Sequence, residues 1–374
     1  MRFRSGRLAA LAVALLLVAA LAVHDDRHYP TMAELADGPF ASPAVGVQFH
    51  GTWAELSDHD QDRILDAMSA AGVRWVRIDV AWSMIAPRRS GEYDERWGVP
   101  QVSRAIGKAR ARGLDVLGMF WSTPDWANNG AGRRVLPADP QDYAVALDWA
   151  ARRWAGQVQA WEVWNEPNSS EFLQPPDPRA YTRLLTAAYD QLKLARIPAP
   201  VVFGGTRYVD TDWIARAYAA GAGHHFDVMA VHPYQGVASL PPEAPATGDP
   251  ERLEHTAALV AELRAHGDGA TPIWFTEFGW SAHANPAGTP VWFQGVTEAT
   301  QADYLRRTLV LLRTRYPQVT NVFWYTSRDL VTGKLHPDHR GLLRRDFTPR
   351  PALAVVRCYV QGCGASASAR GGTR

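Results

Sequence analysis

Residues 158–167 read Val-Gln-Ala-Trp-Glu-Val-Trp-Asn-Glu-Pro, an apolar run that leads directly into an acidic side chain, Glu166. Residues 272–280 read Pro-Ile-Trp-Phe-Thr-Glu-Phe-Gly-Trp and follow the same plan, with Glu277 at the end of the run. We interpret both runs as buried β-strands, because short, nearly continuous apolar runs are typical of parallel strands that are covered on both faces. Each of the two strands therefore carries a glutamate at its carboxyl end.

The chain around these two runs alternates apolar segments with amphipathic segments. Strands are predicted at 45–49, 73–80, 114–120, 158–164, 201–204, 226–231, 272–275 and 319–325. Helices are predicted at 58–71, 102–112, 139–154, 177–195, 210–220, 249–266, 299–316 and 351–359. Three of these helices are expected to begin at an Asp-Pro pair, with the aspartate as N-cap and the proline at N1.

Eight strands that alternate with helices indicate parallel pairing through right-handed crossovers. This pattern favours the α/β class and a single-domain (β/α)₈ TIM barrel. A doubly wound open sheet is the alternative, and it would predict a glycine-rich phosphate turn after the first strand. Residues 50–53 follow that strand as His-Gly-Thr-Trp, which is not such a turn.

Composition narrows the class of protein. The 374 residues include 39 basic and 38 acidic side chains, so the net charge of +1 argues against a nucleic-acid partner, which needs a basic face. The hydrophobic fraction of 47% is ample for a packed core and argues against a disordered chain.

The N-terminus predicts export. Arginines at positions 2, 4 and 7 precede an apolar run over 8–23, and the small-x-small sequence at 20–22 suits cleavage. We expect residues 1–23 to be a signal peptide, 24–43 a linker, 44–360 the barrel and 361–374 a disordered tail. We therefore expect the protein to be secreted or extracytoplasmic. The alternative is an uncleaved N-terminal anchor, which would be the one route to membrane contact.

Only two cysteines are present, Cys358 and Cys363, near the C-terminus. Export to an oxidising compartment favours a disulfide between them, which would staple the last helix to the tail. Two unpaired thiols are the alternative.

The two glutamates suggest a chemistry. In a barrel the carboxyl ends of all strands meet on one face, so Glu166 and Glu277 are expected to face each other across it. Two facing carboxylates suit glycoside hydrolysis, in which one protonates the leaving oxygen and the other attacks or activates water. Ordinary strand-end charges are the simpler explanation, and two such glutamates in aromatic-rich strand ends favour the functional one.

The motifs at the strand ends resemble those of the large retaining glycoside hydrolase clan built on (β/α)₈ barrels. Trp164-Asn165-Glu166-Pro167 resembles its W-N-E-P signature, and residues 274–280 resemble its strand-seven nucleophile segment. Further matches are His232-Pro233-Tyr234 after strand six, Arg77 on strand two and Trp324 on strand eight. The resemblance covers nearly the whole chain after residue 44 and is closest to family 39-like and family 5-like glycosidases.

The resemblance implies that Glu166 is the general acid/base and that Glu277 is the nucleophile. The remaining implied roles are a hydrogen bond to the sugar 2-OH from Asn165, support of the nucleophile by Arg77 and Tyr234, an apolar floor from Trp324, and shaping of the pocket by His232. A cation beside the nucleophile would lower its pKa, whereas the acid needs surroundings that raise its pKa. From strand parity alone, Arg77 could instead pair with Asp79 or Glu162 in a buried ion network.

Fifteen tryptophans suggest stacking surfaces for a sugar ring. The candidates at or after strand ends are Trp82, Trp121, Trp126, Trp164, Trp280, Trp292 and Trp324. Those on predicted helices or within strands are expected to pack the core.

The sequence thus predicts an exported, monomeric, retaining glycosidase that cleaves β-linked oligo- or polysaccharides and needs no metal or organic cofactor. One alternative is a non-catalytic carbohydrate-binding barrel, although both glutamates are present. Another is a metal-dependent barrel hydrolase that uses His50, Asp79 and His232, although the tight ligand motifs of such sites are missing.

Overall fold

The computed structural model describes residues 39–53 and 56–363. The expected signal peptide or anchor at 1–23, residues 24–38 of the expected linker, and the tail from residue 364 lie outside the described residues. Among the described helices, none has the length and apolar character needed to cross a membrane.

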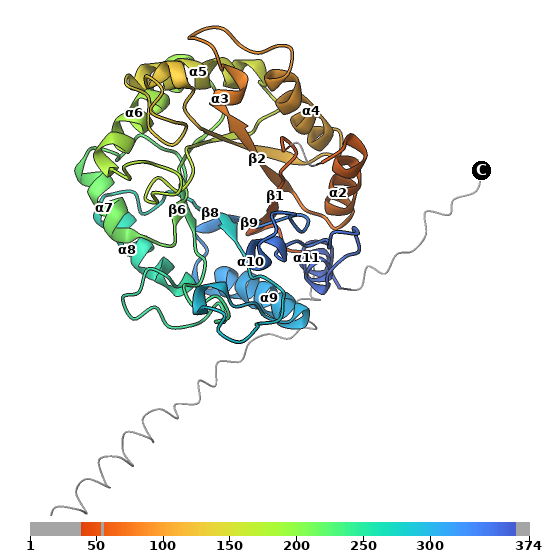
Figure 1. Ribbon diagram of the computed structural model, residues 1–374. Coiled ribbons are helices and arrows are strands. Elements are labelled where there is room, and N and C mark those ends of the chain that lie inside the picture. Colours follow the sequence, from red (N-terminus) through yellow and green to blue (C-terminus); the bar gives the residue numbers. More distant parts are fainter. Residues whose placement is uncertain (1–38, 54–55, 364–374) are drawn as a thin grey trace, which may run out of the picture.

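The described part of the chain is built on parallel strands surrounded by helices (Figure 1). The strands are β1 Ala44–Gln48, β2 Trp75–Ala81, β3 Asp115–Trp121, β4 Ala160–Val163, β5 Val201–Phe203, β6 Thr206–Arg207, β7 Met229–His232, β8 Ile273–Phe278 and β9 Val319–Trp324. They are hydrogen-bonded in the order β5-β4-β3-β2-β1-β9-β8-β7-β6.

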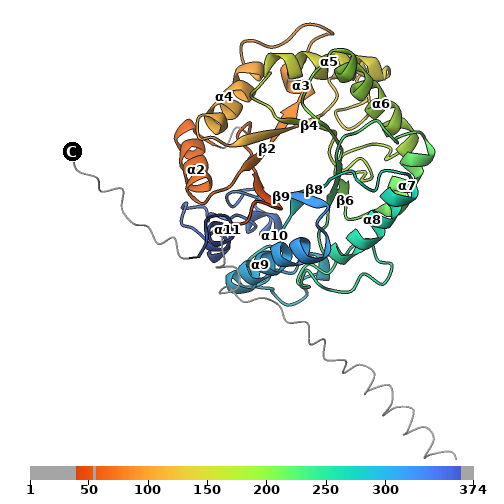
Figure 2. The same cartoon turned by 180° about the vertical axis from the view of Figure 1, so that it is seen from behind.

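The sheet closes into a barrel between β5 and β7. A parallel bridge pairs Val202 with Val228, and the Phe203 N–H donates to the Val228 carbonyl at 2.9 Å. β5 and β6 are two halves of the fifth barrel strand, interrupted at Gly204 and Gly205, and β6 also pairs with β7. Seen from either end, the helices form a ring around the strands (Figures 1 and 2). The predicted (β/α)₈ barrel is therefore confirmed, and the open-sheet alternative is wrong.

The main helices agree with the predicted ones to within a few residues, with one exception. They are α2 Asp58–Ala70, α4 Gly98–Arg110, α5 Pro140–Arg153, α6 Pro178–Leu194, α7 Thr211–Ala219, α8 Thr256–Ala265, α9 Glu298–Arg315 and α11 Pro351–Gln361. Short helices that the sequence did not predict are α3 Trp82–Ile85 and α10 Leu335–Asp338.

The exception is the helix expected to begin at Asp249. The Asp139 and Asp177 carboxylates cap α5 and α6 as predicted, each accepting from the backbone N–H two residues on. The Asp249 carboxylate also accepts from the N–H two residues on, at Glu251, but it closes an isolated turn. The helix itself begins at Thr256, after a 3₁₀ turn at Leu253–His255.

The barrel interior has an apolar lower part, toward the amino ends of the strands, and a polar upper part, toward their carboxyl ends. The lower part is a cluster of Leu117, Ala160, Val202, Val228, Ala230, Trp274 and Phe323, with Trp75 packed against it. On β2, Trp75, Arg77 and Asp79 share this inward side, because alternate residues of a strand point the same way. The apolar cluster therefore lies below Arg77, and the polar groups of the interior lie above the cluster, at the carboxyl ends of the strands.

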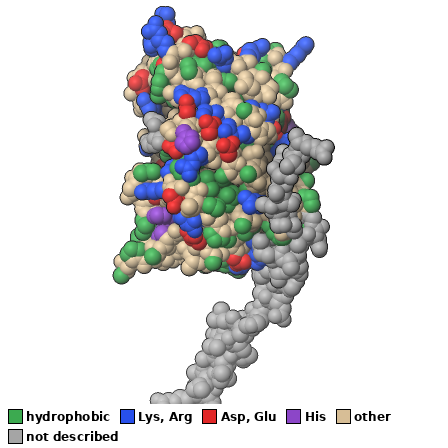
Figure 3. All heavy atoms as spheres, turned by 90° about the vertical axis from the view of Figure 1, so that its right-hand side faces the viewer, with side chains coloured by type: hydrophobic (Ala, Val, Ile, Leu, Met, Phe, Trp, Pro, Cys, Tyr) green, Lys and Arg blue, Asp and Glu red, His purple; other side chains and the backbone are tan. Residues whose placement is uncertain are grey.

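The C-terminal end of α11 carries the predicted disulfide between Cys358 and Cys363. On the face shown in Figure 3, basic and acidic side chains are interspersed, in keeping with the near-zero net charge.

Candidate active site

The two glutamates singled out in the sequence lie together at the carboxyl ends of the strands. Glu166 follows β4, and Glu277 lies near the end of β8. One carboxylate oxygen of each, together with a ring nitrogen of His232, lie within 4.8 Å of one another. Both carboxylates line a cavity of about 490 Å³. The structure thus brings together three predicted site residues from the carboxyl ends of three different strands.

The backbone leaves β4 through a sharp turn that directs Glu166 into the barrel. Trp164 and Glu166 both have positive φ angles, 73° and 40°, which are unfavourable for residues other than glycine. The Glu166 N–H donates to the Gly205 carbonyl at 3.0 Å, which ties this turn to the fifth barrel strand. Strained backbone of this kind is concentrated at functional sites, where the surrounding structure enforces it.

Arg77 is the central cation of the site. Its side chain is 1% exposed and extends from β2 into the barrel. Nε donates to Glu162 Oε2 at 2.6 Å, and Nη1 donates to Glu277 Oε1 at 2.6 Å and to Gln48 Oε1 at 2.9 Å. Nη2 donates to Asn165 Oδ1 at 2.7 Å. Strand parity left open whether Arg77 pairs with an interior acid or with the nucleophile candidate; it does both.

The Glu277 carboxylate is held in its charged form. Burial by itself raises the pKa of this carboxyl, but electrostatic interaction with His232 and with the guanidinium of Arg77 outweighs burial, and the pKa lies below its usual value. Hydrogen bonds from the Tyr234 hydroxyl, 3.0 Å from Oε2, and from Arg77 act in the same direction. Glu277 is therefore an ionised carboxylate with both oxygens fixed.

His232 connects Glu166 to the buried Glu162 through Thr276. The Thr276 hydroxyl donates to Glu162 Oε1 at 2.9 Å, so its oxygen accepts from His232 Nε2 at 3.0 Å. His232 Nδ1 then faces Glu166 Oε1 at 3.0 Å, and one proton lies between these two atoms. This assignment follows from the hydrogen-bond network. The proton of this hydrogen bond is therefore within reach of the Glu166 carboxylate.

A glycine makes this network possible. The Gly205 N–H donates to Glu162 Oε1 at 3.0 Å. A Cβ on Gly205 would lie 2.4 Å from His232 Nε2 and 2.5 Å from Thr276 Oγ1, so no larger residue fits. Sequence reasoning did not single out Gly205 or Thr276, and it treated Glu162 as structural. The Gly-Gly pair at the end of a predicted strand was the available signal, because such glycines often mark close approach of other groups.

Most of the seven tryptophans expected to offer stacking surfaces to a sugar are buried instead. Trp324 has no exposed surface, so its ring offers no face to a ligand in this structure. Trp82, Trp164 and Trp280 are also buried. Trp121 is partly exposed, packs against Trp164, and has an indole N–H without a hydrogen-bond partner among the described residues. Of the seven candidates, only Trp292 lines the cavity within the described part of the chain.

The other cavity residues come mainly from the connections between elements, with Arg207 on β6 and His336 on α10, and the sequence analysis did not single them out. They are Glu171, Phe172, Arg207, Tyr208, Gln235, Gly236, Glu251, Phe293, Tyr325, His336 and Arg340. Their presence makes the cavity both aromatic and strongly charged.

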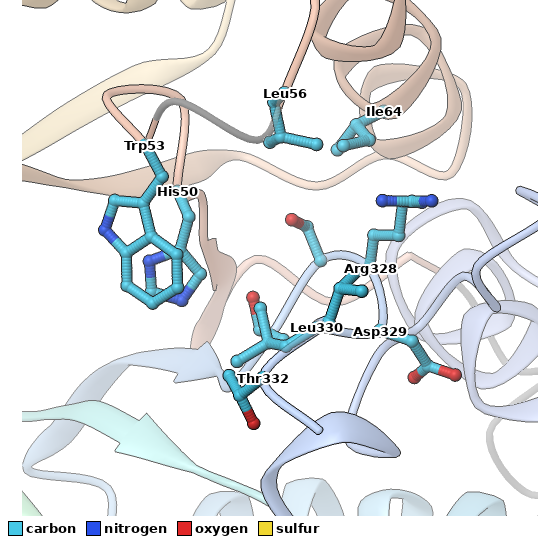
Figure 4. A pocket seen from close by; sticks show the side chains of 11 residues that line it. His50, Trp53, Leu56, Ile64, Arg328, Asp329, Leu330 and Thr332 are labelled. Carbon is cyan, nitrogen blue, oxygen red and sulfur yellow. The ribbon is translucent and has the colours of Figure 1, made fainter. Parts of the chain in front are cut away.

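A second, smaller cavity of about 130 Å³ lies beside the first strand end, between the β1–α2 connection and residues 326–332 (Figure 4). At one side of it, the Trp53 ring stacks on His50 with centroids 3.8 Å apart. His50 Nδ1 is 3.5 Å from Asp79 Oδ2. Among the described residues, His50 and Asp79 do not join His232 in a group with metal-binding spacing.

No protein-family model matches the sequence, and no curated protein matches it. Several solved structures share its architecture. A family 39 glycoside hydrolase from the gut symbiont Bacteroides cellulosilyticus WH2 is 24% identical, with a TM-score of 0.68 over 87% of this chain and 64% of that one. This chain therefore spans slightly less than two thirds of that protein's length.

Two further structures are similar over most of the chain. A family 39 enzyme from Xanthomonas axonopodis pv. citri is 19% identical, with a TM-score of 0.65 over 90% of this chain and 71% of that one. A family 5, subfamily 18 glycoside hydrolase from Streptomyces cattleya, in complex with GlcNAc, is 21% identical, with a TM-score of 0.63 over 86% and 80% of the two chains. These similarities establish the (β/α)₈ fold of the chain.

Proposed function

We propose that this chain is a retaining glycoside hydrolase that cleaves β-linked oligo- or polysaccharides by double displacement. The observation that carries the proposal is the approach of the Glu166 and Glu277 carboxylate oxygens to within 4.8 Å. Retaining enzymes hold their two carboxyl groups about 5–5.5 Å apart, whereas inverting enzymes separate them by about 6.5–9.5 Å to admit a water. An approach within 4.8 Å between one oxygen of each carboxylate is compatible with the shorter separation and with direct attack by one carboxylate.

In the first step, an oxygen of Glu277 attacks the anomeric carbon and forms a glycosyl-enzyme ester. The bond from that carbon to the leaving oxygen breaks, and the proton between Glu166 and His232 passes to the leaving oxygen. In the second step, Glu166 takes a proton from water, the water oxygen attacks the anomeric carbon, and Glu277 leaves as a carboxylate.

Asn165 is oriented for the sugar 2-OH by the cation that holds the nucleophile. Asn165 Oδ1 accepts from Arg77 Nη2, and among the described residues no hydrogen bond from its amide NH₂ is found, so that NH₂ can donate to a ligand. A hydrogen bond to the 2-OH that strengthens in the transition state contributes to catalysis in this class of reaction.

Two further observations support a glycosidase, and a third supports export. The named structural neighbours are glycoside hydrolases of families 39 and 5. The cavity offers aromatic surfaces, among them Trp292, Phe293 and Tyr325, that suit sugar rings. The Cys358–Cys363 disulfide is compatible with export to an oxidising compartment. A carbohydrate-binding barrel without activity is the second candidate, favoured by the same cavity and distinguished by the absence of any product.

The test is a panel of chromogenic β-glycosides and β-linked polysaccharides with sizing of the products. The wild-type chain is expected to release product from at least one member, and Glu277→Ala is expected to lose about 10⁴-fold in kcat. Glu251→Ala is the matched control, because this acid lines the cavity but lies outside the facing pair. Retained activity in Glu277→Ala would reject the assignment, and binding without product from any member would favour the non-catalytic barrel.

A further inference from the structure

Arg340 is a cation of the cavity that has no acidic partner among the described residues. It comes from the segment that follows β9 and lines the same cavity as Glu166 and Glu277. Its side-chain contacts are a hydrogen bond to His336 and a position over the Tyr234 ring. Within the described part of the chain, no carboxylate forms an ion pair with its guanidinium. The other cavity arginine, Arg207, is already paired with Glu171 at 3.2 Å.

The side chain of Arg340 is held in place by neutral groups. Nη2 donates to His336 Nε2 at 2.6 Å, and the guanidinium carbon lies 4.5 Å from the centroid of the Tyr234 ring. The Arg340 carbonyl accepts from the indole of the buried Trp324 at 2.8 Å, which also fixes the backbone. These contacts orient the guanidinium without compensating its charge.

The histidine beneath Arg340 is kept uncharged. His283 Nδ1 donates to the Ala284 carbonyl at 2.7 Å, which leaves His283 Nε2 as an acceptor for His336 Nδ1 at 3.5 Å. His336 Nε2 is then the acceptor for Arg340. Burial, with the charge of Arg340 and the proximity of His283, lowers the pKa of His336 to about 3. His336 is therefore a neutral support for a positive charge.

The position of this charge relative to the nucleophile is defined by Tyr234. The Tyr234 hydroxyl donates to Glu277 Oε2, while the ring of the same residue lies under Arg340. Arg340 thus lies on the Glu277 side of the cavity, where the sugar that forms the glycosyl-enzyme binds. Of the five N–H donors of its guanidinium, one donates to a side chain of the described residues, that of His336. A half-buried guanidinium with free donors is best satisfied by a carboxylate or sulfate, which it binds through its planar fork.

We propose that Arg340 makes the cavity selective for an acidic sugar. In such a sugar, a carboxylate or a sulfate ester is a substituent of the same ring that Glu277 attacks. The inference rests on the proposed function and names its substrate class. The four acids of the cavity do not neutralise the cation, because Glu277, Glu166 and Glu171 are engaged with Arg77, His232 and Arg207. The fourth, Glu251, lies beside Gly236 and forms no ion pair with Arg340.

The competing explanation is that Arg340 only positions Tyr234 and thereby supports Glu277. The two explanations differ in a measurable way. A positioning residue changes the rate for every substrate by the same factor, whereas a receptor for an anion changes the ratio between acidic and neutral substrates.

The experiment uses chromogenic β-glycosides that share one ring configuration and differ only at C5, which carries hydrogen, CH₂OH, carboxylate or a sulfated CH₂O group. Series with the gluco, galacto and manno configurations are compared. The wild-type chain is expected to favour the acidic members by about 100-fold in kcat/KM, and Arg340→Gln is expected to reduce that preference to near one. Arg340→Lys should restore part of it, and Arg207→Gln, the matched control, should keep it. The better of the carboxylate and sulfate members identifies the source of the negative charge.

Equal rates on neutral and acidic glycosides in the wild type would overturn this inference while leaving the glycosidase proposal intact. An equal loss on all members in Arg340→Gln would also overturn it. If no glycoside is cleaved, the proposed function fails, and saturation-transfer NMR with sodium glucuronate, galacturonate and mannuronate against the parent hexoses decides the inference. Binding of a uronate that is lost in Arg340→Gln supports it, and absence of such binding overturns it. Thermal unfolding confirms that each variant is folded.

Discussion

Arg77 Nη1 and Glu277 Oε1 lie 2.6 Å apart, in an ion pair whose cation is almost wholly buried. The same guanidinium contacts Glu162 and Asn165, so one side chain positions the proposed nucleophile, a buried acid and the residue proposed to bind the sugar 2-OH. The site is therefore organised from β2, even though both proposed catalytic carboxylates come from other strands.

Arg77→Lys is expected to lower kcat/KM by about 100-fold and to lower Tm, because one ammonium group cannot make the planar contacts of a guanidinium. Loss of a partner from a buried ion pair costs about 3–5 kcal/mol, and the retained charge of lysine should keep the loss below that range. Steady-state kinetics and thermal unfolding measure the two effects. The control is Arg74→Lys, in which the exposed arginine pairs with the partly buried Asp115, and this change should alter stability by about 0.5 kcal/mol or less. Equal behaviour of the two variants would contradict the role of Arg77.

Tyr234→Phe is expected to move the acid limb of the kcat/KM profile to higher pH. The hydroxyl stabilises ionised Glu277, so its removal raises the pKa of a group whose pKa lies below its usual value of 4.5. Activity requires the ionised carboxylate and is lost as pH falls through that pKa. The loss should therefore begin at a higher pH in the variant than in the wild type.

The control for this shift is Tyr325→Phe, which removes a cavity hydroxyl that has no hydrogen bond to Glu277 in the described part of the chain. Its acid limb should remain where the wild-type limb lies. An unshifted limb in Tyr234→Phe would show that the hydrogen bond does not influence the pKa of Glu277.

Glu166→Gln is expected to act selectively on substrates with poor leaving groups. An acid is needed when the leaving oxygen is basic and is dispensable when it is a good leaving group, so kcat/KM should fall by about 10³-fold for alkyl glycosides and far less for dinitrophenyl glycosides. The measurement is the dependence of kcat/KM on leaving-group pKa. Glu171→Gln removes another cavity carboxylate, paired with Arg207, and should leave that dependence unchanged. A uniform loss across leaving groups would argue that Glu166 is not the acid.

Replacement of both cysteines by serine is expected to lower stability without changing kcat/KM. The disulfide closes a loop with a sequence separation of 5, for which loop entropy predicts about 2 kcal/mol at most. The end of α11 contacts the end of α2 through Gln361 and Ala70, and the Tyr359 carbonyl accepts from the Phe40 N–H just before β1. These contacts lie at the amino ends of the strands, away from the cavity. A large loss of activity in the folded double variant would contradict this separation.

The fold and the facing glutamates could be predicted from the sequence because strand–helix alternation is a local pattern and barrel geometry brings strand ends together. The alternation of side-chain direction along a strand also predicted that Arg77 points into the barrel. The partners of Arg77, however, depend on side-chain lengths and on the register between strands. The His232–Thr276–Glu162 chain likewise depends on the space left by Gly205, which only the assembled barrel reveals.

The cavity wall was harder to predict. Tryptophans at strand ends can turn inward or outward there, and Trp324 packs beneath the segment that carries Arg340. His336 and Arg340 follow β9 in a segment without regular periodicity, so nothing local indicates that they return to the face that carries Glu166 and Glu277. Their positions are determined by contacts with distant residues such as His283 and Tyr234.

The most direct test of the account is the anomeric configuration of the first product, followed by ¹H NMR before mutarotation. With the best β-glycoside from the panel, double displacement by Glu277 predicts that the β-anomer of the released sugar appears first and the α-anomer only later. Initial release of the α-anomer would show a single displacement by water and would contradict the assignment of Glu277 as the nucleophile.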